Sequence, residues 1–431
     1  MRTNFTAYQL QDPDVAHCEK ALRACVHCGF CTSTCPTYVL LGNELDSPRG
    51  RIRLIQDMLE SGEKPSATAV KHIDRCLSCL GCATTCPSSV DYMRLIDHAR
   101  LFVAERYDRP FLDRMVRLGI AKILPRDWAF RLMLLLGKAA RPIESWLPQQ
   151  LRRLIAATSG ARAALAPMRS HYRAQGSAQK RVILLNSCVQ NVLAPQINRA
   201  TIALLTRLGV DVLIPQGSGC CGAISHHLGR RAEALRFARA NLNAWAVELQ
   251  GGGIDAVLVN ASGCGTMVKD YGHLLRGEEK IAETAKTLSE RTQDITEFLT
   301  EIGYRPTQKM PPLRVAYHPP CSLQHGQKII GVGEALLKSA GFEVRDIPEA
   351  HLCCGAAGTY NLLEPEIAAQ LRERKAKHIT HTRAHVLASG NLGCLQHLAG
   401  ALDVPVVHTV ELLDWAAGGE RPKALPEGSH S

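Results

Sequence analysis

Two copies of one cysteine pattern stand near the start of the sequence, CVHCGFCTSTCP at residues 25–36 and CLSCLGCATTCP at residues 76–87. In both copies, gaps of two, two and three residues separate four cysteines, and a proline follows the fourth. This is the spacing of thiolate ligands to 4Fe-4S clusters, in which three cysteines of one tight loop bind one cluster and the fourth binds its neighbour. The sequence therefore predicts two 4Fe-4S clusters that exchange their fourth ligands.

The exchange assigns eight cysteines to the two clusters. One cluster takes Cys25, Cys28, Cys31 and Cys86, and the other takes Cys76, Cys79, Cys82 and Cys35. A structural role as ordinary buried thiols would need eight coincidences at matched spacing. Zinc is the stronger competitor because cysteine pairs separated by two residues often bind it, but zinc sites do not normally use a third and a fourth cysteine before proline.

Length and composition limit the protein class. At 431 residues and 46% hydrophobic content, the chain should form two or three domains. The first ten residues lack the charged-then-apolar pattern of a secretory signal, so we expect the 17 cysteines to stay reduced in the cytoplasm. No apolar run approaches the length needed to cross a bilayer. The net charge of +11 could attract nucleic acid, anionic lipid or an acidic protein, and does not choose among them.

Eight of the remaining nine cysteines form two quartets in the same order. They are Cys188, Cys220, Cys221 and Cys264, followed by Cys321, Cys353, Cys354 and Cys394. The second quartet follows the first by 133 residues at its first three positions and by 130 at the last, which indicates an internal duplication. Each quartet could bind a further iron-sulfur cluster, bind zinc, or consist of free buried thiols.

Strand-like and helix-like segments alternate in both repeats. In the first repeat we expect strands at 181–186, 210–214 and 256–260 and helices at 200–208 and 230–249. In the second we expect strands at 314–317, 343–347 and 386–388 and helices at 333–340 and 365–380. The alternation predicts parallel sheets. All four cysteines of each repeat should then lie in loops at the carboxyl ends of strands.

The predicted fold class is multidomain, α and α/β. We expect an α-helical ferredoxin-like domain with both clusters over residues 1–106, a helical connector over 107–177, and two duplicated cysteine-rich α/β domains over 178–305 and 306–431. Prolines at 125, 142 and 148 should break the connector into short helices. Its basic amphipathic stretch, 118–136, could rest on anionic lipid or pack on the neighbouring domains.

Some polar residues near the cysteines could act on bound metal. His27, Arg49 and Arg51 could tune cluster potentials through charge and hydrogen bonds, or could be ordinary surface or packing residues. Three histidines near the quartets, His226, His227 and His318, could be ligands. Because they are not repeated symmetrically, we favour ordinary packing roles for them.

The chain lacks a full nucleotide-binding fingerprint, since Gly331-Val332-Gly333 has no third glycine. Clusters with complete cysteine ligation carry single electrons and offer no open iron, so a two-electron oxidation should take place on the organic cofactor of another chain. The predicted role is therefore electron transfer within a complex, and we assign no catalytic residue.

The sequence resembles the iron-sulfur subunit of bacterial glycolate oxidase, within a wider class that joins a ferredoxin-type domain to two cysteine-rich "CCG" domains. The resemblance covers nearly the whole chain, and its more specific marks are RACVHCGFC at 23–31, SPRGR at 47–51, ASGCG at 261–265 and HLCCGAAGTY at 351–360. It implies a relay subunit of a membrane-associated glycolate oxidase, or glycolate dehydrogenase. FAD-containing partner subunits would oxidise glycolate to glyoxylate, and electrons would pass to a quinone.

The same resemblance implies a cytoplasmic protein, peripheral on the cytoplasmic face of the inner membrane, with no nucleic-acid partner. The chain departs from the heterodisulfide reductase type, which ends each repeat with paired cysteines, because Cys264 and Cys394 stand alone. Alternatives are a subunit of a lactate, other 2-hydroxy-acid or glycerol-3-phosphate dehydrogenase, a heterodisulfide-reductase-like enzyme, and a metal-stabilised interaction scaffold. Each repeat thus has four candidate cysteine ligands instead of five, which counts against a heterodisulfide-reductase-like enzyme. An aromatic content of 5% counts against a scaffold that binds nucleic acid.

Overall fold

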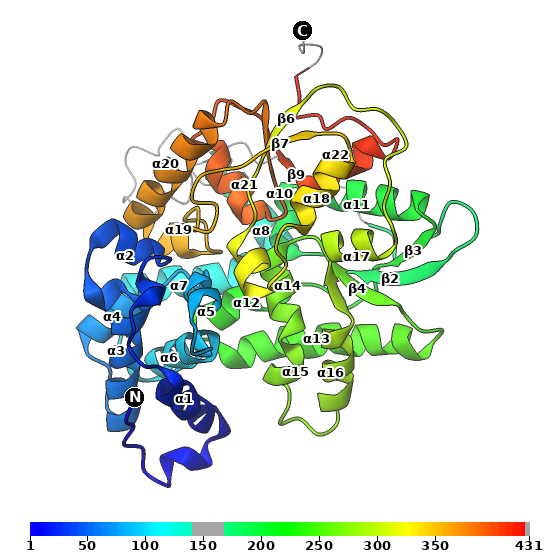
Figure 1. Cartoon of the computed structure of the whole chain (residues 1–431). Helices are drawn as coiled ribbons and strands as arrows, with labels where there is room; N and C mark the ends of the chain where they lie inside the picture. Colours follow the sequence, from blue (N-terminus) through cyan, green and yellow to red (C-terminus); the bar gives the residue numbers. More distant parts are fainter. Residues whose placement is uncertain (140–167, 427–431) are drawn as a thin grey trace.

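The computed structural model describes residues 1–139 and 168–426, and its N-terminal part is helical (Figure 1, blue). Its elements are η1 (Gln9–Gln11), α1 (Pro13–Ala24), η2 (Phe30–Thr32), α2 (Pro36–Leu41), η3 (Glu44–Asp46), α3 (Pro48–Ser61), α4 (Ala67–Asp74), α5 (Gly81–Thr85) and α6 (Tyr92–Arg106). The prolines that follow Cys35 and Ser47 occupy first helical turns, where their missing N–H costs nothing. The apolar faces of α1, α3, α4 and α6 bury a common core around Leu22, Ile55 and Ile96.

Two further helices, α7 (Phe111–Ile123) and α8 (Asp127–Ala139), follow within the predicted connector and are separated at Pro125. The inner faces of α7 and α8 pack against the first repeat, through contacts such as Phe130 with Val192. Prolines 142 and 148 lie outside the described residues. A short strand, β1 (His171–Tyr172), which falls in the range predicted as connector, pairs antiparallel with the first sheet.

The first repeat forms a five-stranded sheet in the order β1-β3-β2-β4-β5, parallel except for β1. Its strands are β2 (Lys180–Leu184), β3 (Val210–Leu213), β4 (Ala256–Val259) and β5 (Thr292–Asp294). Its helices are α10 (Cys188–Leu193), α11 (Pro195–Arg207), α12 (Ala223–His227), α13 (Arg231–Gln250), α14 (Ser262–Lys269), α15 (Tyr271–Leu274), α16 (Ala282–Glu290) and α17 (Ile295–Glu301).

The second repeat forms a four-stranded parallel sheet in the order β7-β6-β8-β9. Its strands are β6 (Arg314–Tyr317), β7 (Glu343–Arg345), β8 (Val386–Ser389) and β9 (Val406–His408). They are accompanied by the π-helical turn η5 (Ser322–Gly326) and by α18 (Val332–Ser339), α19 (Tyr360–Leu363), α20 (Pro365–His381), α21 (Leu392–Ala399) and α22 (Thr409–Ala416). The strand order repeats that of β3-β2-β4-β5, so the duplication extends to the topology.

The two repeats share a large hydrophobic core, and each repeat also has a smaller buried cluster of its own. Apolar residues of both sheets, such as Leu184 and Val315, belong to the same buried cluster, and α11 of the first repeat packs against α22 of the second. Polar bonds cross the same boundary: His408 Nε2 lies 2.9 Å from the backbone oxygen of Asn260, and Arg207 pairs with Asp414 at 2.7 Å. The cysteine-bearing ends of the repeats also lie close together, since Ser262 Oγ is 2.7 Å from Ser322 Oγ.

The fold class predicted from the sequence is confirmed, and each predicted strand and helix of the repeats has a counterpart in the structure. One prediction is wrong. Cys188, Cys264 and Cys394 do not lie in loops, because each falls in the first turn of a helix that begins directly after a strand ends. The chain turns into these helices within two or three residues, and this places the thiols at the same sheet edge that the loops would have provided.

Candidate iron-sulfur centres

The first cysteine loop lines a hollow that is partly open to solvent and lies between η2, α3 and the loop after α5. Cys25, Cys28 and Cys31 line it together with Cys86 of the second loop. Burial, together with the nearby Cys25, Cys86 and Cys28 thiols, raises the pKa of the Cys31 thiol to about 11. The fourth thiol therefore comes from the other loop, as in the exchange of ligands predicted from the sequence.

The second set gathers deeper in the domain. Burial raises the pKa of the Cys82 thiol well above its ordinary value, and the Cys79, Cys76 and Cys35 thiolates raise it further. Cys35 comes from the first loop and is buried where α2 begins. The structure thus brings together Cys76, Cys79, Cys82 and Cys35.

The backbone of both loops has an unusual conformation at equivalent positions. His27 and Gly29 have φ angles of 55° and 86°, and Ser78 and Leu80, 51 residues later, have φ angles of 50° and 60°. A left-handed conformation is costly for residues other than glycine, and proteins retain it mainly at functional sites. Here the conformation turns three cysteines of each short loop toward one point.

A buried ionic network supports the second set. Arg51, only 1% exposed, directs one guanidinium nitrogen at Cys35 Sγ over 3.7 Å and donates to the His72 carbonyl at 2.7 Å and to Thr37 Oγ1 at 3.0 Å. The carboxylate of Asp46 balances this charge and also lies 2.8 Å from His72 Nδ1. Arg51 therefore faces a cluster thiolate, as one of the two readings from sequence predicts.

Arg49 behaves differently. Its guanidinium is half-exposed, pairs with Glu44 at 2.7 Å and reaches the carbonyl of His27 at 3.5 Å. It lines the hollow of the first loop but donates to no thiol among the described residues. Tyr92, which the sequence reasoning overlooked, lies against both sets: it lines the first hollow, and its hydroxyl is 3.7 Å from Cys76 Sγ.

In the first repeat the four cysteines of the quartet meet. The sulfurs of Cys188 and Cys220 are 3.6 Å apart, and Cys221 contacts both Cys220 and Cys264. The φ angle of Gly222 is +88°, and a Cβ atom there would lie 2.9 Å from the backbone oxygen of Ala234. The glycine after the cysteine pair is thus required for a tight turn against α13.

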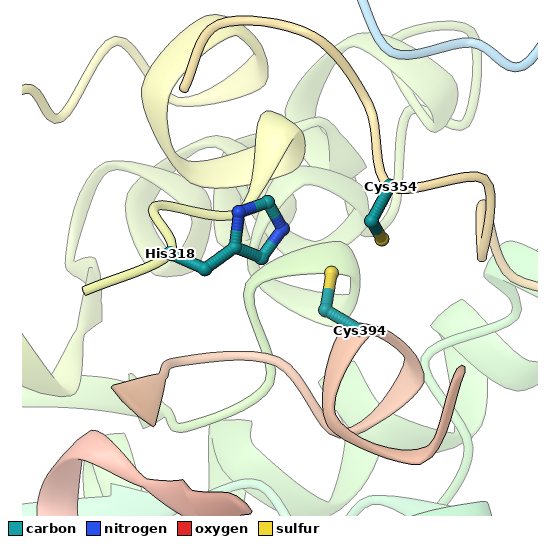
Figure 2. Close-up of side chains that lie close together, drawn as sticks. All are labelled: His318, Cys354 and Cys394. Atoms are coloured by element: carbon teal, nitrogen blue, oxygen red, sulfur yellow. The ribbon is translucent and has the colours of Figure 1, made fainter. Parts of the chain in front are cut away.

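The second quartet has the same chain of contacts, from Cys321 through Cys353 and Cys354 to Cys394. It has one further member. One ring nitrogen of His318 lies near the sulfurs of Cys354 and Cys394, with the three ligand atoms within 4.8 Å of one another (Figure 2). Our expectation of a packing role for His318 overlooked this convergence. Its position three residues before Cys321, directly after a predicted strand, was the signal in the sequence.

The other two histidines have ordinary partners. His226 Nε2 lies 3.3 Å from Asp97 of α6, and His227 Nδ1 lies 3.8 Å from the same carboxylate. Asp97 holds the pKa of His226 above its ordinary value despite burial. Both histidines therefore help to join the first repeat to the helical domain.

The second repeat also lies against the helical domain. Leu77 and Cys79 of the second cysteine loop pack against Cys321, Cys353 and Tyr360. Thr84 Oγ1 is 2.8 Å from His325 Nδ1, and the hydroxyl of Tyr360 donates to the Arg75 carbonyl at 3.2 Å. The second ferredoxin-type set and the second quartet are thus neighbours.

The residues present fit iron-sulfur clusters. Buried thiols crowded in fours resist ionisation because of desolvation and mutual repulsion, and bound cations reverse that balance by holding the thiolates. The hollow at the first loop, the turned backbone at both loops and the cationic Arg51 beside Cys35 are the features that such a group needs.

The helices of the part of the chain that the structure describes include none with the length and apolar character of a membrane span.

Comparisons with known proteins agree with this arrangement. A 4Fe-4S dicluster domain matches residues 21–90, and a cysteine-rich domain, CCG, matches residues 182–269 and again 315–399. A Helicobacter pylori structure described as a hypothetical protein matches with a TM-score of 0.55 at 9% identity, covering 96% of this chain and 74% of that one. At this identity the match shows a shared fold alone.

Relatives of similar sequence carry informative names. The glycolate oxidase iron-sulfur subunit of Escherichia coli is 40% identical over 419 residues, covering 96% of this chain and 99% of the relative. A probable glycolate oxidase iron-sulfur subunit of Bacillus subtilis is 29% identical, covering 93% and 95%. Lactate utilization protein A of Oceanobacillus iheyensis is 29% identical but covers only 54% of this chain. The chain belongs to the family of the bacterial glycolate oxidase iron-sulfur subunit.

Proposed function

We propose that this chain is the electron-transfer subunit of a glycolate oxidase complex. Partner subunits that carry FAD would oxidise glycolate to glyoxylate, and a quinone would accept the electrons. The proposal is supported by 40% identity along 96% of the chain and by the two crossed sets of four thiols in the helical domain.

Cys25, Cys28, Cys31 and Cys86 would hold one 4Fe-4S cluster, and Cys76, Cys79, Cys82 and Cys35 the other. When bound, such clusters carry electrons one at a time. The chain itself binds them, excludes water from the second set and supplies the cation of Arg51 beside Cys35. Hydrogen bonds and positive charge near a thiolate favour the reduced cluster and raise its potential.

The experiment separates substrate oxidation from electron delivery in the assembled complex. Replacing Cys79 with Ala should leave flavin reduction by glycolate intact in single-turnover measurements and abolish reduction of a soluble quinone analogue. Replacing Cys18, the buried cysteine outside the two cluster sets and the two quartets, with Ala is the matched control and should leave both steps intact. If C79A reduced the quinone analogue at the wild-type rate, the relay role would be wrong.

Lactate is the second candidate substrate, because lactate utilization protein A relatives match just over half of the chain. Single-turnover flavin reduction with glycolate and with lactate distinguishes the two. Faster reduction by lactate at equal concentration would replace glycolate in the proposal and leave the relay role unchanged.

We also propose a peripheral membrane position through the outer faces of α7 and α8. Large apolar side chains are exposed there, among them Phe111 at 65%, Trp128 at 70% and Leu135 at 62%. Basic residues, including Arg126 and Lys138, accompany them. Apolar anchors among cations are the pattern of helices that lie in the interface of an anionic membrane.

Co-sedimentation of the full chain with vesicles tests the membrane proposal. Binding to vesicles of 30% anionic lipid should fall about tenfold in W128E. The control is V247E, which changes an exposed apolar residue of α13 remote from α8, and should bind as the wild type does. Equal loss in both variants, or no binding of the wild type, would contradict the proposal.

A further inference from the structure

His318 lies in an environment that ordinary packing does not explain. Its side chain is fully buried, and neither Nδ1 nor Nε2 has a hydrogen-bond partner among the described residues. A buried imidazole without partners loses its hydrogen bonds to water and gains none in exchange, which is unfavourable.

Two thiols lie close to the ring of His318. Cys354 comes from the loop after β7 and Cys394 from the first turn of α21, and in Figure 2 both sulfurs lie on one side of the ring. The three ligand atoms lie within 4.8 Å of one another. A tetrahedral zinc site with Zn–N near 2.0 Å and Zn–S near 2.3 Å separates its ligand atoms by roughly 3.5–3.8 Å. A contraction of at most about 1.3 Å would close this set around one ion.

The neighbouring Cys353 can supply the fourth ligand, although it lies outside the set of three whose ligand atoms are within 4.8 Å of one another. The thiol of Cys353 contacts that of Cys354, and its sulfur also accepts from the backbone N–H of Gly355 at 3.4 Å. Four protein ligands without an open position are typical of structural zinc sites, and three cysteines with one histidine are a common set.

The first repeat lacks this arrangement. Leu185 and His318 are equivalent positions, because each directly follows a central strand of its sheet and precedes its cysteine by three residues. Each also donates its backbone N–H to the neighbouring strand: Leu185 to the Leu258 carbonyl at 2.9 Å, and His318 to the Ala388 carbonyl at 2.8 Å. Leucine offers no ligand atom. The duplication has therefore given the two quartets different ligand sets.

The two repeats also differ in the charge of the side chain that faces the quartet from the helix beside it. The ammonium of Lys375 is buried in α20 within electrostatic reach of Cys353 and Cys354, and it donates to the backbone oxygen of Glu349. One zinc ion with three thiolates has a net charge of −1, which this ammonium offsets. Ala234 packs against Gly222 in the first repeat as Ala368 packs against Gly355 in the second. Counted from these alanines, the neutral Asn241 occupies in the first repeat the position of Lys375 in the second.

We propose that the second quartet binds a single zinc ion through the imidazole of His318 and the thiolates of Cys353, Cys354 and Cys394. The site holds the loop after β7 to α21 and to the end of β6. It concerns the second repeat alone, and holds whether or not the eight ferredoxin-type cysteines carry electrons.

Metal analysis of the full-length chain tests the site. Wild type should contain one zinc per chain, and H318L should lose it, with an affinity at least about tenfold weaker. Leucine is chosen because the first repeat accommodates it at the equivalent position. The matched control is H381L, which removes an exposed histidine of the same repeat and should retain zinc. The iron content should be equal in all three proteins.

X-ray absorption at the zinc edge tests the ligand itself, and remains informative if H318L fails to fold. Wild type should show one nitrogen and three sulfur ligands, and H318C should retain zinc with four sulfurs. An all-sulfur shell in wild type, undiminished zinc in H318L, or a quartet filled with iron instead of zinc would each overturn the proposal.

Discussion

Arg51 and Asp46 form a buried ion pair at the second cluster site, with side chains only 1% and 0% exposed. Such a pair contributes little net stability while both partners are present, but removing one leaves the other charge and its neighbours unsatisfied in the interior. The SPRGR string shows an arginine near the cysteines, whereas the pairing with Asp46 and His72 depends on three separate helices. Sequence reasoning could therefore name Arg51 but could not place it.

Replacing Arg51 with Met should destabilise the helical domain by about 3–5 kcal/mol, because the Asp46 carboxylate and the His72 carbonyl lose a buried donor. The midpoint of urea-induced loss of the visible cluster absorbance measures the effect. Arg53 pairs with Asp57 at the surface, so R53M is the control and should change the stability by less than about 1 kcal/mol. Equal midpoints for the two variants would refute the role given to Arg51.

At the scale of elements, periodicity and alternation located the longer strands and helices of the repeats because each has its own apolar pattern. The edge strands β5 and β9 were not predicted, although β7, which also has three residues, was. Cys188, Cys264 and Cys394 were misplaced into loops because the turn from strand to helix is too short to leave a signal. The ligand role proposed here for His318 required the positions of two other elements, β7 and α21.

Asp294 links β5 to α17, where it accepts from Thr296 N at 2.9 Å and Thr296 Oγ1 at 2.6 Å. Burial raises its pKa from 3.8 to about 6, against the lowering effect of Thr296. The folded state therefore binds a proton more tightly than the unfolded state, and this contribution to stability is lost as the pH rises from about 4 to 6.

We expect wild type to lose about 1.4 kcal/mol of stability relative to D294N between pH 5 and pH 7.5. Asparagine keeps the helix-capping acceptor and has no charge to bury. Thermal unfolding of both proteins across this range measures the difference. Parallel pH profiles would show that Asp294 has the same proton affinity in the folded and unfolded states.

At the scale of the whole molecule, the helical domain lies against both repeats (Figure 1). Arg94 of α6 forms a two-pronged ion pair with Asp270, and Asp14 of α1 pairs with Arg231 and Arg276 of the first repeat. The sequence predicted the parts but gave no indication of this packing, because ion pairs between residues 176 or more apart leave no local pattern.

Gly229 is the tightest point of this interface. Its φ angle is +74°, and a Cβ atom would lie 2.5 Å from the Arg100 carbonyl oxygen and 2.6 Å from Ala104 Cβ, both on α6. We expect G229A to loosen α6 from α12 and to raise amide hydrogen exchange in both helices by about tenfold. Gly42 has a similar φ of +61° with nothing within 4 Å, so G42A controls for backbone strain alone. Equal exchange at α6 and α12 in both variants would contradict the close packing.

The central claim is that this chain carries two 4Fe-4S clusters on eight crossed cysteines. Iron and acid-labile sulfide should be measured on anaerobically purified protein, with paramagnetic resonance of the dithionite-reduced sample. The account predicts about eight irons and eight sulfides per chain, with signals of two interacting reduced clusters that fall to one cluster in C79A. Protein with zinc in place of iron at these cysteines, or iron without acid-labile sulfide, would contradict it.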